Sequence, residues 1–399
     1  MYTRLADHIE PSRRAELEAN LRACVHCGFC NATCPTYQLL GDELDGPRGR
    51  IYLIKQVLEG RTATRLTQTH LDRCLSCRAC ETACPSGVQY GRLLDAGRES
   101  VDRQVERTFF DQLIRYIIVR IFPYRHRFSI VLKVFRRLRP LLPPALRDKI
   151  PTATQPVPSW PQSDHVRRML ILPGCVQPAL APGIDAAAAS VLDRLGISLL
   201  RVKNGVCCGA LPHHLSAQDR ALDLARKNID ACLPYLEQGI EAIISTASGC
   251  GVMMKDYGQL LKDDPVYAKK AARFSAAVRD IAEVLADEDL SAFRTDGRRI
   301  AFQSPCTLQH GQRLKGLPEA ILQKIGYRLT PVSEAHLCCG SAGVYSLLQP
   351  DLSRKLRDVK LAALQAGRPD LIATANIGCL MHLQTAAQQK VVHWIELLQ

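Results

Sequence analysis

Apolar positions recur at helical spacing through most of the first 140 residues, with polar and charged residues between them. This period predicts amphipathic helices rather than strands. Up to residue 107 the predicted helices are short and alternate with cysteine-rich loops; they cover Pro11–Ala23, Arg50–Leu58 and Arg92–Arg107. Two basic amphipathic helices are predicted within residues 109–139, the second of them over Ser129–Leu138. The apolar stripe of the first consists of Phe110, Leu113, Ile114, Ile117 and Ile121.

A different pattern begins after a proline-rich stretch. Seven prolines lie between residues 140 and 161, and because proline disfavours helix interiors and central strands, a linker is predicted over 140–165. Beyond it, short apolar runs alternate with helical patterns, which predicts an α/β fold with a largely parallel sheet. The predicted strands are Met169–Leu172, Ala242–Thr246, Ile300–Gln303 and Leu371–Thr374, and the main predicted helices are Gln218–Leu236 and Leu352–Ala366.

Cysteines in the second half of the chain form an internal repeat. The first copy has Cys175, Cys207-Cys208-Gly209 and Cys250, and the second has Cys306, Cys338-Cys339-Gly340 and Cys379. In both copies the adjacent pair follows the first cysteine by 32 residues. The first and third cysteines follow predicted strands, so they are expected on the loops where α/β folds place ligands. We therefore expect an α+β multidomain protein with a helical module (1–102), a basic segment with a linker (103–165) and two repeated α/β domains (166–290 and 291–399).

Eight further cysteines form two copies of the pattern C-x2-C-x2-C-x3-C-P, from Cys24 to Pro35 and from Cys74 to Pro85. Three thiolates spaced by two residues can wrap one face of an iron–sulfur cube, whereas the fourth, turned away before the proline, ligates the other cluster. The pattern therefore predicts a ferredoxin-like module with two [4Fe–4S] clusters. One cluster is assigned to Cys24, Cys27, Cys30 and Cys84, and its partner to Cys34, Cys74, Cys77 and Cys80.

A pair of zinc sites is the structural alternative, because two C-x2-C pairs also suit tetrahedral zinc. Zinc sites usually separate their pairs by a dozen or more residues, whereas here a third cysteine follows at once. His26, inside the first motif, is expected to be a solvent-facing loop residue, because four thiolates are already present. Cys232, outside both patterns, is expected to serve packing.

The repeated Cys-Cys-Gly motifs predict a third metal or iron–sulfur site in at least one copy, although buried structural cysteines remain the alternative. Adjacent thiolates suit a multi-iron cluster, and the following glycine permits close approach of the backbone. The second copy is favoured because His382 follows its third cysteine by three residues, whereas the first copy has Met253 there. The candidate ligands are Cys306, Cys338, Cys339, Cys379 and His382.

Charge is concentrated in one segment. The formal net charge is +13, and residues 103–149 contain twelve lysines and arginines against three acids. No apolar run approaches the roughly 18 residues of a spanning helix, and the N-terminus has no secretory h-region. We expect an intracellular, cytoplasmic protein whose segment from about Phe109 to Leu142 lies on the inner face of the membrane or against a membrane-bound partner. Nucleic-acid binding is not expected, because the segment lacks a recognition motif.

These motifs together resemble the iron–sulfur subunits of bacterial glycolate oxidase. The resemblance rests on CVHCGFCNATCPTY, GPRGRIYLIK, CLSCRACETACPSGVQYG, the two CCG repeats, IGCLMHL and HWIELL, and it spans nearly the whole chain. It implies an oxidoreductase complex in which FAD-bearing partner subunits oxidise glycolate to glyoxylate and this chain relays electrons toward membrane quinone. It also implies that the eight N-terminal cysteines are cluster ligands, and that this chain has no catalytic residue of its own.

Related functions remain as alternatives. The same motifs occur in iron–sulfur subunits of lactate utilisation systems and anaerobic glycerol-3-phosphate dehydrogenase, and in heterodisulfide reductase, a self-contained enzyme. CCG units of that last relative usually end in C-x-x-C, whereas this chain has Cys250 with Met253 and Cys379 with His382. This departure disfavours disulfide-cleaving chemistry. No G-x-G-x-x-G fingerprint follows any predicted strand, so FAD is expected in a partner only.

Overall fold

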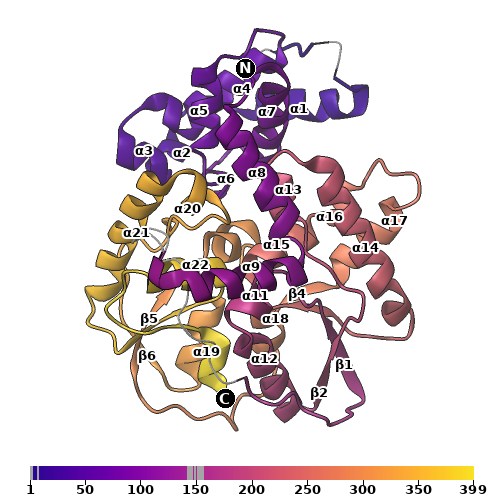
Figure 1. Ribbon diagram of the computed structural model, residues 1–399, viewed down its shortest axis with the longest axis vertical. Coiled ribbons are helices and arrows are strands. Elements are labelled where there is room, and N and C mark those ends of the chain that lie inside the picture. Colours follow the sequence, from indigo (N-terminus) through magenta and orange to yellow (C-terminus); the bar gives the residue numbers. More distant parts are fainter. Residues whose placement is uncertain (1–2, 7–8, 142–146, 148–149, 151–156) are drawn as a thin grey trace.

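The computed structural model describes residues 3–6, 9–141, 147, 150 and 157–399, and Figure 1 shows how its parts are arranged. A helical module built by the N-terminal residues lies above two α/β units in this view. Each unit contains a four-stranded sheet. The predicted α+β class, with a helical module followed by two repeated α/β domains, is thereby confirmed. Residues 142–146, 148–149 and 151–156 of the predicted linker lie outside the described residues.

Short helices joined by cysteine-containing loops form the N-terminal module. They are α1 (Pro11–Ala23), α2 (Phe29–Ala32), α3 (Pro35–Leu40), η1 (Glu43–Asp45), α4 (Pro47–Leu58), α5 (Arg65–Asp72), α6 (Ala79–Thr82) and α7 (Tyr90–Gln104). The prediction of α1 is confirmed, whereas α4 begins three residues before the predicted helix and α7 lies two to three residues earlier than predicted. Gly97 lets α7 approach α4, because a Cβ there would come 2.6 Å from Ile54 Cγ1. The module thus has a tight core of its own, with Ile54 and Leu93 fully buried.

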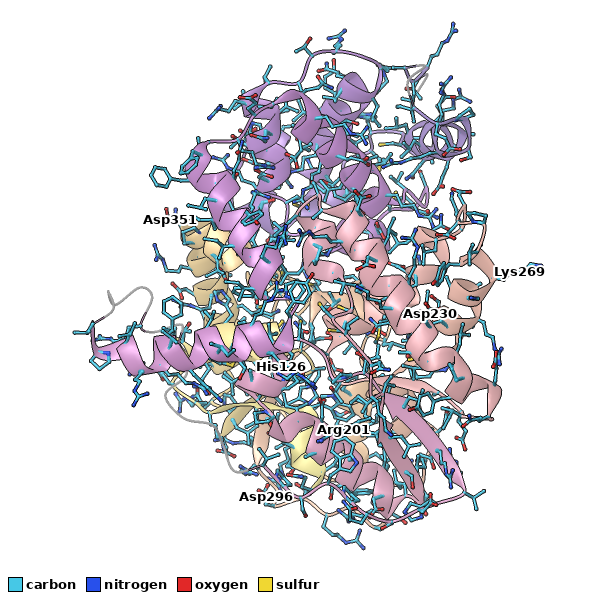
Figure 2. The ribbon with its side chains drawn as sticks, turned by 45° about the vertical axis from the view of Figure 1, so that its right-hand side comes forward. His126, Arg201, Asp230, Lys269, Asp296 and Asp351 are labelled. Atoms are coloured by element: carbon cyan, nitrogen blue, oxygen red, sulfur yellow. The ribbon has the colours of Figure 1, made fainter. Side chains whose placement is uncertain are left out.

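Two basic helices follow the module, as predicted: α8 (Phe109–Ile121) and α9 (Arg125–Leu138), which ends in the short turn η2 (Arg139–Leu141). α9 begins four residues before the predicted helix at Ser129. α8 descends from the module and α9 crosses the front of the α/β units (Figures 1 and 2). Only a narrow stripe of α9 is buried, where Phe128 and Leu132 pack near Leu180. None of the helices in the described part of the chain is long and apolar enough to cross a membrane.

The first α/β unit has the strand order β2-β1-β3-β4, with all neighbouring strands parallel. Its strands are β1 (Arg167–Ile171), β2 (Ile197–Arg201), β3 (Ile243–Ser245) and β4 (Val278–Asp280). Its helices are α11 (Gln177–Leu180), α12 (Gly183–Arg194), α13 (Ala210–His214), α14 (Gln218–Glu237), α15 (Ser248–Lys255), α16 (Tyr257–Leu260), α17 (Ala268–Ala277) and α18 (Ile281–Ala286). Arg201, at the end of β2, stacks its guanidinium 3.8 Å above the Trp160 ring, which fastens the preceding segment to the sheet (Figure 2).

The second unit repeats this topology with the order β6-β5-β7-β8, again parallel throughout. Its strands are β5 (Arg299–Gln303), β6 (Arg328–Leu329), β7 (Leu371–Thr374) and β8 (Val391–His393). Its helices are η3 (Thr307–Gly311, a π-helix), α19 (Leu317–Lys324), α20 (Tyr345–Leu348), α21 (Pro350–Gln365), α22 (Ile377–Gln384) and η4 (Trp394–Leu398). The four predicted strands are all present, within two residues of the predicted bounds.

One hydrophobic core joins the two units. It contains strand residues of both sheets, and η4 packs against α12 while α18 packs against α19. Trp394 is fully buried in it, and Arg194 at the end of α12 donates a hydrogen bond to the Leu398 carbonyl at 3.2 Å. Each unit therefore covers a helix of the other. This packing fixes the cysteine loops of the first unit relative to those of the second.

Candidate metal centres

The two N-terminal cysteine motifs share one backbone turn. His26 and Gly28 have φ angles of 55° and 88°, and the equivalent Ser76 and Arg78 have φ angles of 53° and 59°. Successive residues of this kind can turn backbone N–H groups toward an anion, and the Ser76 amide lies 3.5 Å from Cys74 Sγ. Arginine rarely adopts a positive φ, and here an ion pair of 2.7 Å to Asp256 of the first α/β unit anchors the Arg78 side chain.

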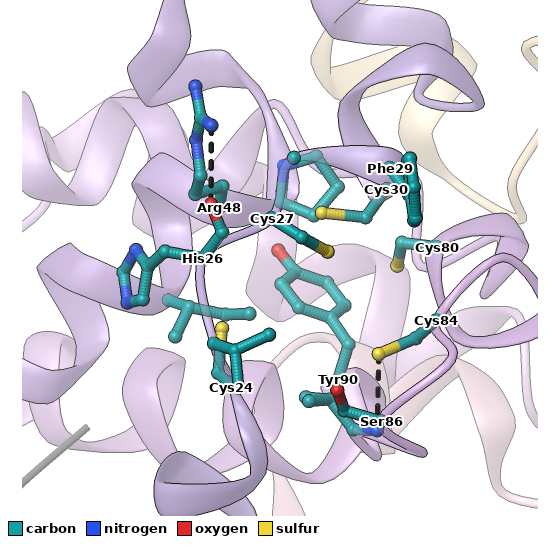
Figure 3. Close-up of a pocket in the computed structure, with 15 residues that line it drawn as sticks. Cys24, His26, Cys27, Phe29, Cys30, Arg48, Cys80, Cys84, Ser86 and Tyr90 are labelled. Atoms are coloured by element: carbon teal, nitrogen blue, oxygen red, sulfur yellow. Dashed lines mark hydrogen bonds between the residues drawn. The ribbon is translucent and has the colours of Figure 1, made fainter.

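One pocket of the module is lined by five of the cysteines, Cys24, Cys27, Cys30, Cys84 and, at the side of the second motif, Cys80, together with Tyr90 (Figure 3). It reaches the surface, because Cys27 is exposed and its neighbours Val25 and Phe29 are exposed by 67% and 63%. On the inner side the Val88 amide donates to Cys84 Sγ at 3.5 Å. The structure thus brings the fourth cysteine of the second motif to the first three of the first motif.

His26 borders the same pocket, and its side chain is less exposed than the sequence suggests. The sequence predicts a solvent-facing side chain, but Nε2 is buried and has no hydrogen-bond partner within the described part of the chain. Its carbonyl accepts a hydrogen bond from Arg48 at 3.4 Å (Figure 3). Burial, reinforced by the nearby Arg48 cation, lowers the pKa of His26. His26 is therefore a loop residue, as predicted, with a side chain of intermediate exposure.

A second pocket lies beside the first and is lined by Cys34, Cys74, Cys77 and Cys80. Pro47, Tyr90 and Cys80 line both pockets, so the two pockets adjoin. The Tyr90 hydroxyl lies 3.6 Å from Cys74 Sγ. Cys34 Sγ lies 3.3 Å from Thr36 Oγ1 and 4.0 Å from Nη1 of Arg50. These donors and the buried cation make the pocket suitable for anionic sulfur.

The electrostatics of the thiols group them in the same two sets. Burial and then the charges of Cys24, Cys27 and Cys84 raise the pKa of Cys30 to about 11. Burial and then Cys77, Cys74 and Cys34, with Glu81, raise the pKa of Cys80 well above its usual range. Thiols crowded in this way become thiolates only when a cation replaces their protons. A donor set of four soft thiolates in each pocket therefore fits an iron–sulfur cluster.

Both copies of the later repeat also gather their cysteines, at the carboxyl ends of β1 and β3 in the first unit and of β5 and β7 in the second. In the second copy Cys306 Sγ lies 3.8 Å from Cys338 Sγ, and Cys339 interacts with Cys379. In the first copy Cys207 interacts with Cys175, and Cys208 with Cys250. The sulfurs form a chain of neighbours, which suits several metal ions better than one.

The glycine of each Cys-Cys-Gly motif is required by its conformation. Gly209 and Gly340 have φ angles of 85° and 86°, and a Cβ at Gly340 would lie 2.6 Å from the Ser353 carbonyl oxygen. Both amides approach the sulfur two residues before them, at 3.5 Å for Cys207 and 3.4 Å for Cys338. The motif therefore closes a small loop around its first thiol.

His382 and Met253, which occupy equivalent places, are both buried. Nε2 of His382 lies 3.1 Å from Ser353 Oγ, and this hydroxyl donates to the Gly340 carbonyl at 2.7 Å. Nε2 is thus engaged within the protein. Cys232 is fully buried in α14, in the apolar cluster that also contains the thiols of the first copy, and burial raises its pKa to about 12, as expected for a packing residue.

The two copies differ in a charge that sequence patterns do not reveal. Lys360 on α21 is 2% exposed and donates to the carbonyls of Glu334 and Ala335 at 3.1 and 3.0 Å. Burial lowers the pKa of Lys360, while the surrounding thiols of the second copy oppose this shift. In the first copy, the interaction with Cys208 and burial raise the pKa of Cys250, and the buried carboxyl of Asp185 adds a smaller contribution. In the described part of the chain, a buried cation adjoins the thiols of the second copy, and a lysine within a helical pattern gives no sequence signal of it.

The second pocket of the module adjoins the second copy. Leu75 and Cys77 pack in one cluster with Cys306, Cys338 and Tyr345. The Tyr345 hydroxyl donates to the Arg73 carbonyl at 3.1 Å, and Thr82 Oγ1 lies 2.8 Å from Nδ1 of His310 in the π-helix η3. Three groups of thiols therefore follow one another from the surface at Cys27 to the interior of the second unit.

Two family models match the parts described above. Residues 20–88 match a 4Fe-4S dicluster domain, and residues 169–255 and 300–384 match a cysteine-rich domain. The thiol-lined pockets and these matches define an iron–sulfur electron-transfer protein.

Relatives extend over the whole chain. It is 52% identical to the glycolate oxidase iron-sulfur subunit of Escherichia coli (strain K12), covering 100% of this chain and 98% of that protein. It is 30% identical to the probable glycolate oxidase iron-sulfur subunit of Bacillus subtilis (strain 168), covering 96% and 94%. A crystal structure of a hypothetical protein from Helicobacter pylori shares the fold, with a TM-score of 0.54 and 11% identity over 97% of this chain and 72% of that one. The chain belongs to the family of glycolate oxidase iron–sulfur subunits.

Proposed function

We propose that the chain relays electrons from FAD-bearing partner subunits, which oxidise glycolate to glyoxylate, toward membrane quinone. The full-length relation to the Escherichia coli subunit is the observation that carries this proposal. Glycolate loses two electrons and two protons in this reaction, and [4Fe–4S] clusters, when bound, supply transfer of one electron at a time. This chain contributes the path and the partner contributes the substrate chemistry.

We further propose the crossed ligand sets expected from the sequence. Cys24, Cys27, Cys30 and Cys84 hold one cluster, and Cys34, Cys74, Cys77 and Cys80 hold the other. The grouping of these thiols around two adjacent pockets supports this assignment. Backbone amides and the Tyr90 hydroxyl stabilise the thiolates, and the fully buried Arg50 compensates their charge.

In the second copy we propose a third redox site held by Cys306, Cys338, Cys339 and Cys379, with His382 as a further candidate ligand. Its support is the contact with Cys77 and the buried Lys360 cation. Electrons would enter near Cys27, where the module is open to a partner, and leave through the second copy. The first copy, whose thiols face the Asp185 carboxyl instead of a cation, lies outside this path.

Iron content tests the third site. Two clusters of four iron atoms give about eight per chain, and a third site gives more. Cys338→Ser should lower the iron content of the anaerobically purified protein below that of wild type, whereas the equivalent change in the first copy, Cys207→Ser, should not. A wild-type value of eight with no other metal would remove the third site.

We also propose that α8 and α9 lie on the anionic inner face of the cytoplasmic membrane. Phe109, Phe110 and Ile130 expose 72%, 74% and 63% of their surface, and further apolar side chains between them are exposed. The cations around them include Arg125, Lys133 and Arg137, which are exposed and enter no ion pair among the described residues. An apolar face rimmed by cations suits the headgroup region, where each cation contributes about 1 kcal/mol.

Flotation with anionic liposomes tests this surface. Changing Arg125, Lys133 and Arg137 to glutamate should abolish salt-sensitive binding. The matched control carries the same charge change on α17, at Lys269, Lys270 and Arg273, and should bind as wild type does; Lys269 lies at a different edge of the molecule (Figure 2). Equal behaviour of the two variants would assign the exposed face to a protein partner.

The function itself is tested in the assembled complex. The chain is combined with its copurifying flavoprotein, and reduction of a quinone analogue is followed with glycolate, D-lactate or glycerol 3-phosphate. Glycolate should be oxidised fastest, and electron delivery to quinone should require this chain. Preference for either other substrate would place the complex among the related dehydrogenases, and flavoprotein turnover with quinone that is independent of this chain would refute the relay.

A further inference from the structure

A group of metal-binding side chains lies between the module and the first α/β unit, outside every thiol site. Asp95 is on α7 of the module, and His213 and His214 end α13, the helix that follows Cys207-Cys208-Gly209. One ligand atom from each of the three lies within 4.8 Å of the others. Nε2 of His213 is 3.0 Å from Oδ2 of Asp95. The electron path described above uses none of them.

The hydrogen bonds of His213 orient its ring as a ligand. Nδ1 lies 2.8 Å from Oε1 of Gln218, and because an amide oxygen only accepts, Nδ1 carries a proton. Nε2 then faces Asp95 and shares a proton with its carboxylate. A divalent cation can replace that proton and leave the bond to Gln218 intact, which is the arrangement that fixes metal-binding histidines elsewhere.

Asp95 and His214 have coordination capacity left. His213 is the one hydrogen-bond partner of the Asp95 carboxylate within the described part of the chain. The nearby Arg98 donates to the carbonyls of Leu71 and Cys74 rather than to Asp95. His214 is exposed, and its ring enters no hydrogen bond among the described residues. Its exposure leaves a further position open to water.

A second group of potential metal ligands differs from the Asp95 group in the cations that already bind it. Asp42, Asp45 and His70 also bring ligand atoms within 4.8 Å, but Arg50 and Arg73 already bind the Asp45 carboxylate at 3.3 and 2.8 Å. Two cations in contact with the carboxylate exclude a third. Among the residues that the structure describes, no lysine or arginine forms an ion pair with Asp95, so the Asp95 group is the better suited of the two to a metal.

We propose that Asp95, His213 and His214 bind a divalent transition metal such as Zn²⁺, with water as the fourth ligand. Two imidazoles and one carboxylate are a ligand set that zinc accepts. Because Asp95 belongs to the module and both histidines to the first α/β unit, the ion joins the two parts beside the Cys-Cys-Gly loop.

Zinc and iron are measured in the same sample to test the proposal. Anaerobically purified protein is dialysed against a small excess of zinc chloride, desalted and analysed by mass spectrometry for both metals. Wild type should retain about one zinc per chain with its iron unchanged. His214→Gln, an exposed change that leaves the core intact, and Asp95→Asn should lose the zinc and keep the iron. Gln218→Leu should weaken zinc binding about tenfold or more.

His165→Gln is the matched control, because Nε2 of His165 lies 2.9 Å from Asp193 in a pair that has no second histidine. It should retain zinc as wild type does. Zinc that survives in His214→Gln, or is lost in His165→Gln, would overturn the proposal, and so would a wild type that retains none. Zinc that replaces iron would identify the thiol sites as its ligands. Since iron content and quinone reduction are read separately, failure here is distinguishable from failure of the relay.

Discussion

Replacing Arg50 with methionine should destabilise the module measurably. The Arg50 side chain is 1% exposed and donates from Nε to the His70 carbonyl at 2.7 Å, from Nη1 to Thr36 Oγ1 at 3.1 Å and from Nη2 to Asp45 Oδ1 at 3.3 Å. Removing one partner of a buried ion pair costs about 3–5 kcal/mol. Asp45 keeps Arg73 and His70 as partners, so we expect the lower end, about 3 kcal/mol.

The same substitution should change a reduction potential. Nη1 of Arg50 lies 4.0 Å from Cys34 Sγ. At an effective dielectric constant of about 20, a unit charge at this distance contributes about 4 kcal/mol, equivalent to a ceiling of about 180 mV for one electron. The charge of a cluster is spread over more atoms than one sulfur. We therefore expect the potential of the cluster at Cys34 to fall by tens of millivolts, because the lost cation favoured the reduced, more negative form.

Anaerobic urea unfolding, followed by circular dichroism and by absorbance near 400 nm, measures the first effect, and a potentiometric titration measures the second. Arg50→Lys keeps the charge but loses the planar fork, so it should keep most of the potential and lose part of the stability. A stability of Arg50→Met within about 0.5 kcal/mol of wild type would refute the reasoning for the ion pair. An unchanged potential would refute the assignment of Cys34 to a cluster beside Arg50.

Three further substitutions test other parts of the structure. Cys84→Ser should damage the cluster of the first motif more than that of the second, as resolved by electron paramagnetic resonance. The control Cys232→Ser should leave both clusters intact. Loss of the second cluster in Cys84→Ser would overturn the proposal that each motif supplies one ligand to the other motif's cluster. Gly343→Ala should cost roughly 1 kcal/mol of stability through backbone strain alone. Gly340→Ala should cost more in a thermal unfolding experiment, because the Cβ at residue 340 also clashes with the Ser353 carbonyl. Equal losses in the two variants would contradict the close approach of Gly340 to Ser353. Lys360→Met should lower the potential of the second-copy site without altering the N-terminal clusters, and a shift of all sites together would point to general unfolding instead.

Local patterns in the sequence predicted much of this architecture. The helical period located α1, α8 and α9, and the repeated cysteine spacing predicted two α/β units of the same topology. These features depend on neighbours in sequence, so periodicity and ligand spacing reveal them. The bounds of α4 and α7 shifted by a few residues, because the loop residues before them complete the first helical turn.

Features built from distant residues were not predictable in this way. Cys77 meets Cys306 only because α21 and η3 pack on the module, and no spacing records that contact. Lys360 looks like any lysine in an amphipathic helix until the fold buries it beside thiols. The hydrogen bond from Arg48 of α4 to the His26 carbonyl, 22 residues away in sequence, is likewise not indicated by the cysteine motif. Long-range packing, rather than residue type, decided all three.

The shared core of the two α/β units also dictates the order of events during synthesis. α12 ends at Arg194, yet the segment that covers it, Trp394–Leu398, is the last part of the described chain to leave the ribosome. At a synthesis rate of roughly 5–20 residues per second, the apolar face of α12 stays exposed for about 10 to 40 s until the segment that covers it has been made. Throughout that interval the nascent chain exposes the apolar face of α12, near cysteines that have not yet bound iron. Exposed apolar surface of this kind favours aggregation, and a variant without Trp394–Leu398 would leave α12 uncovered.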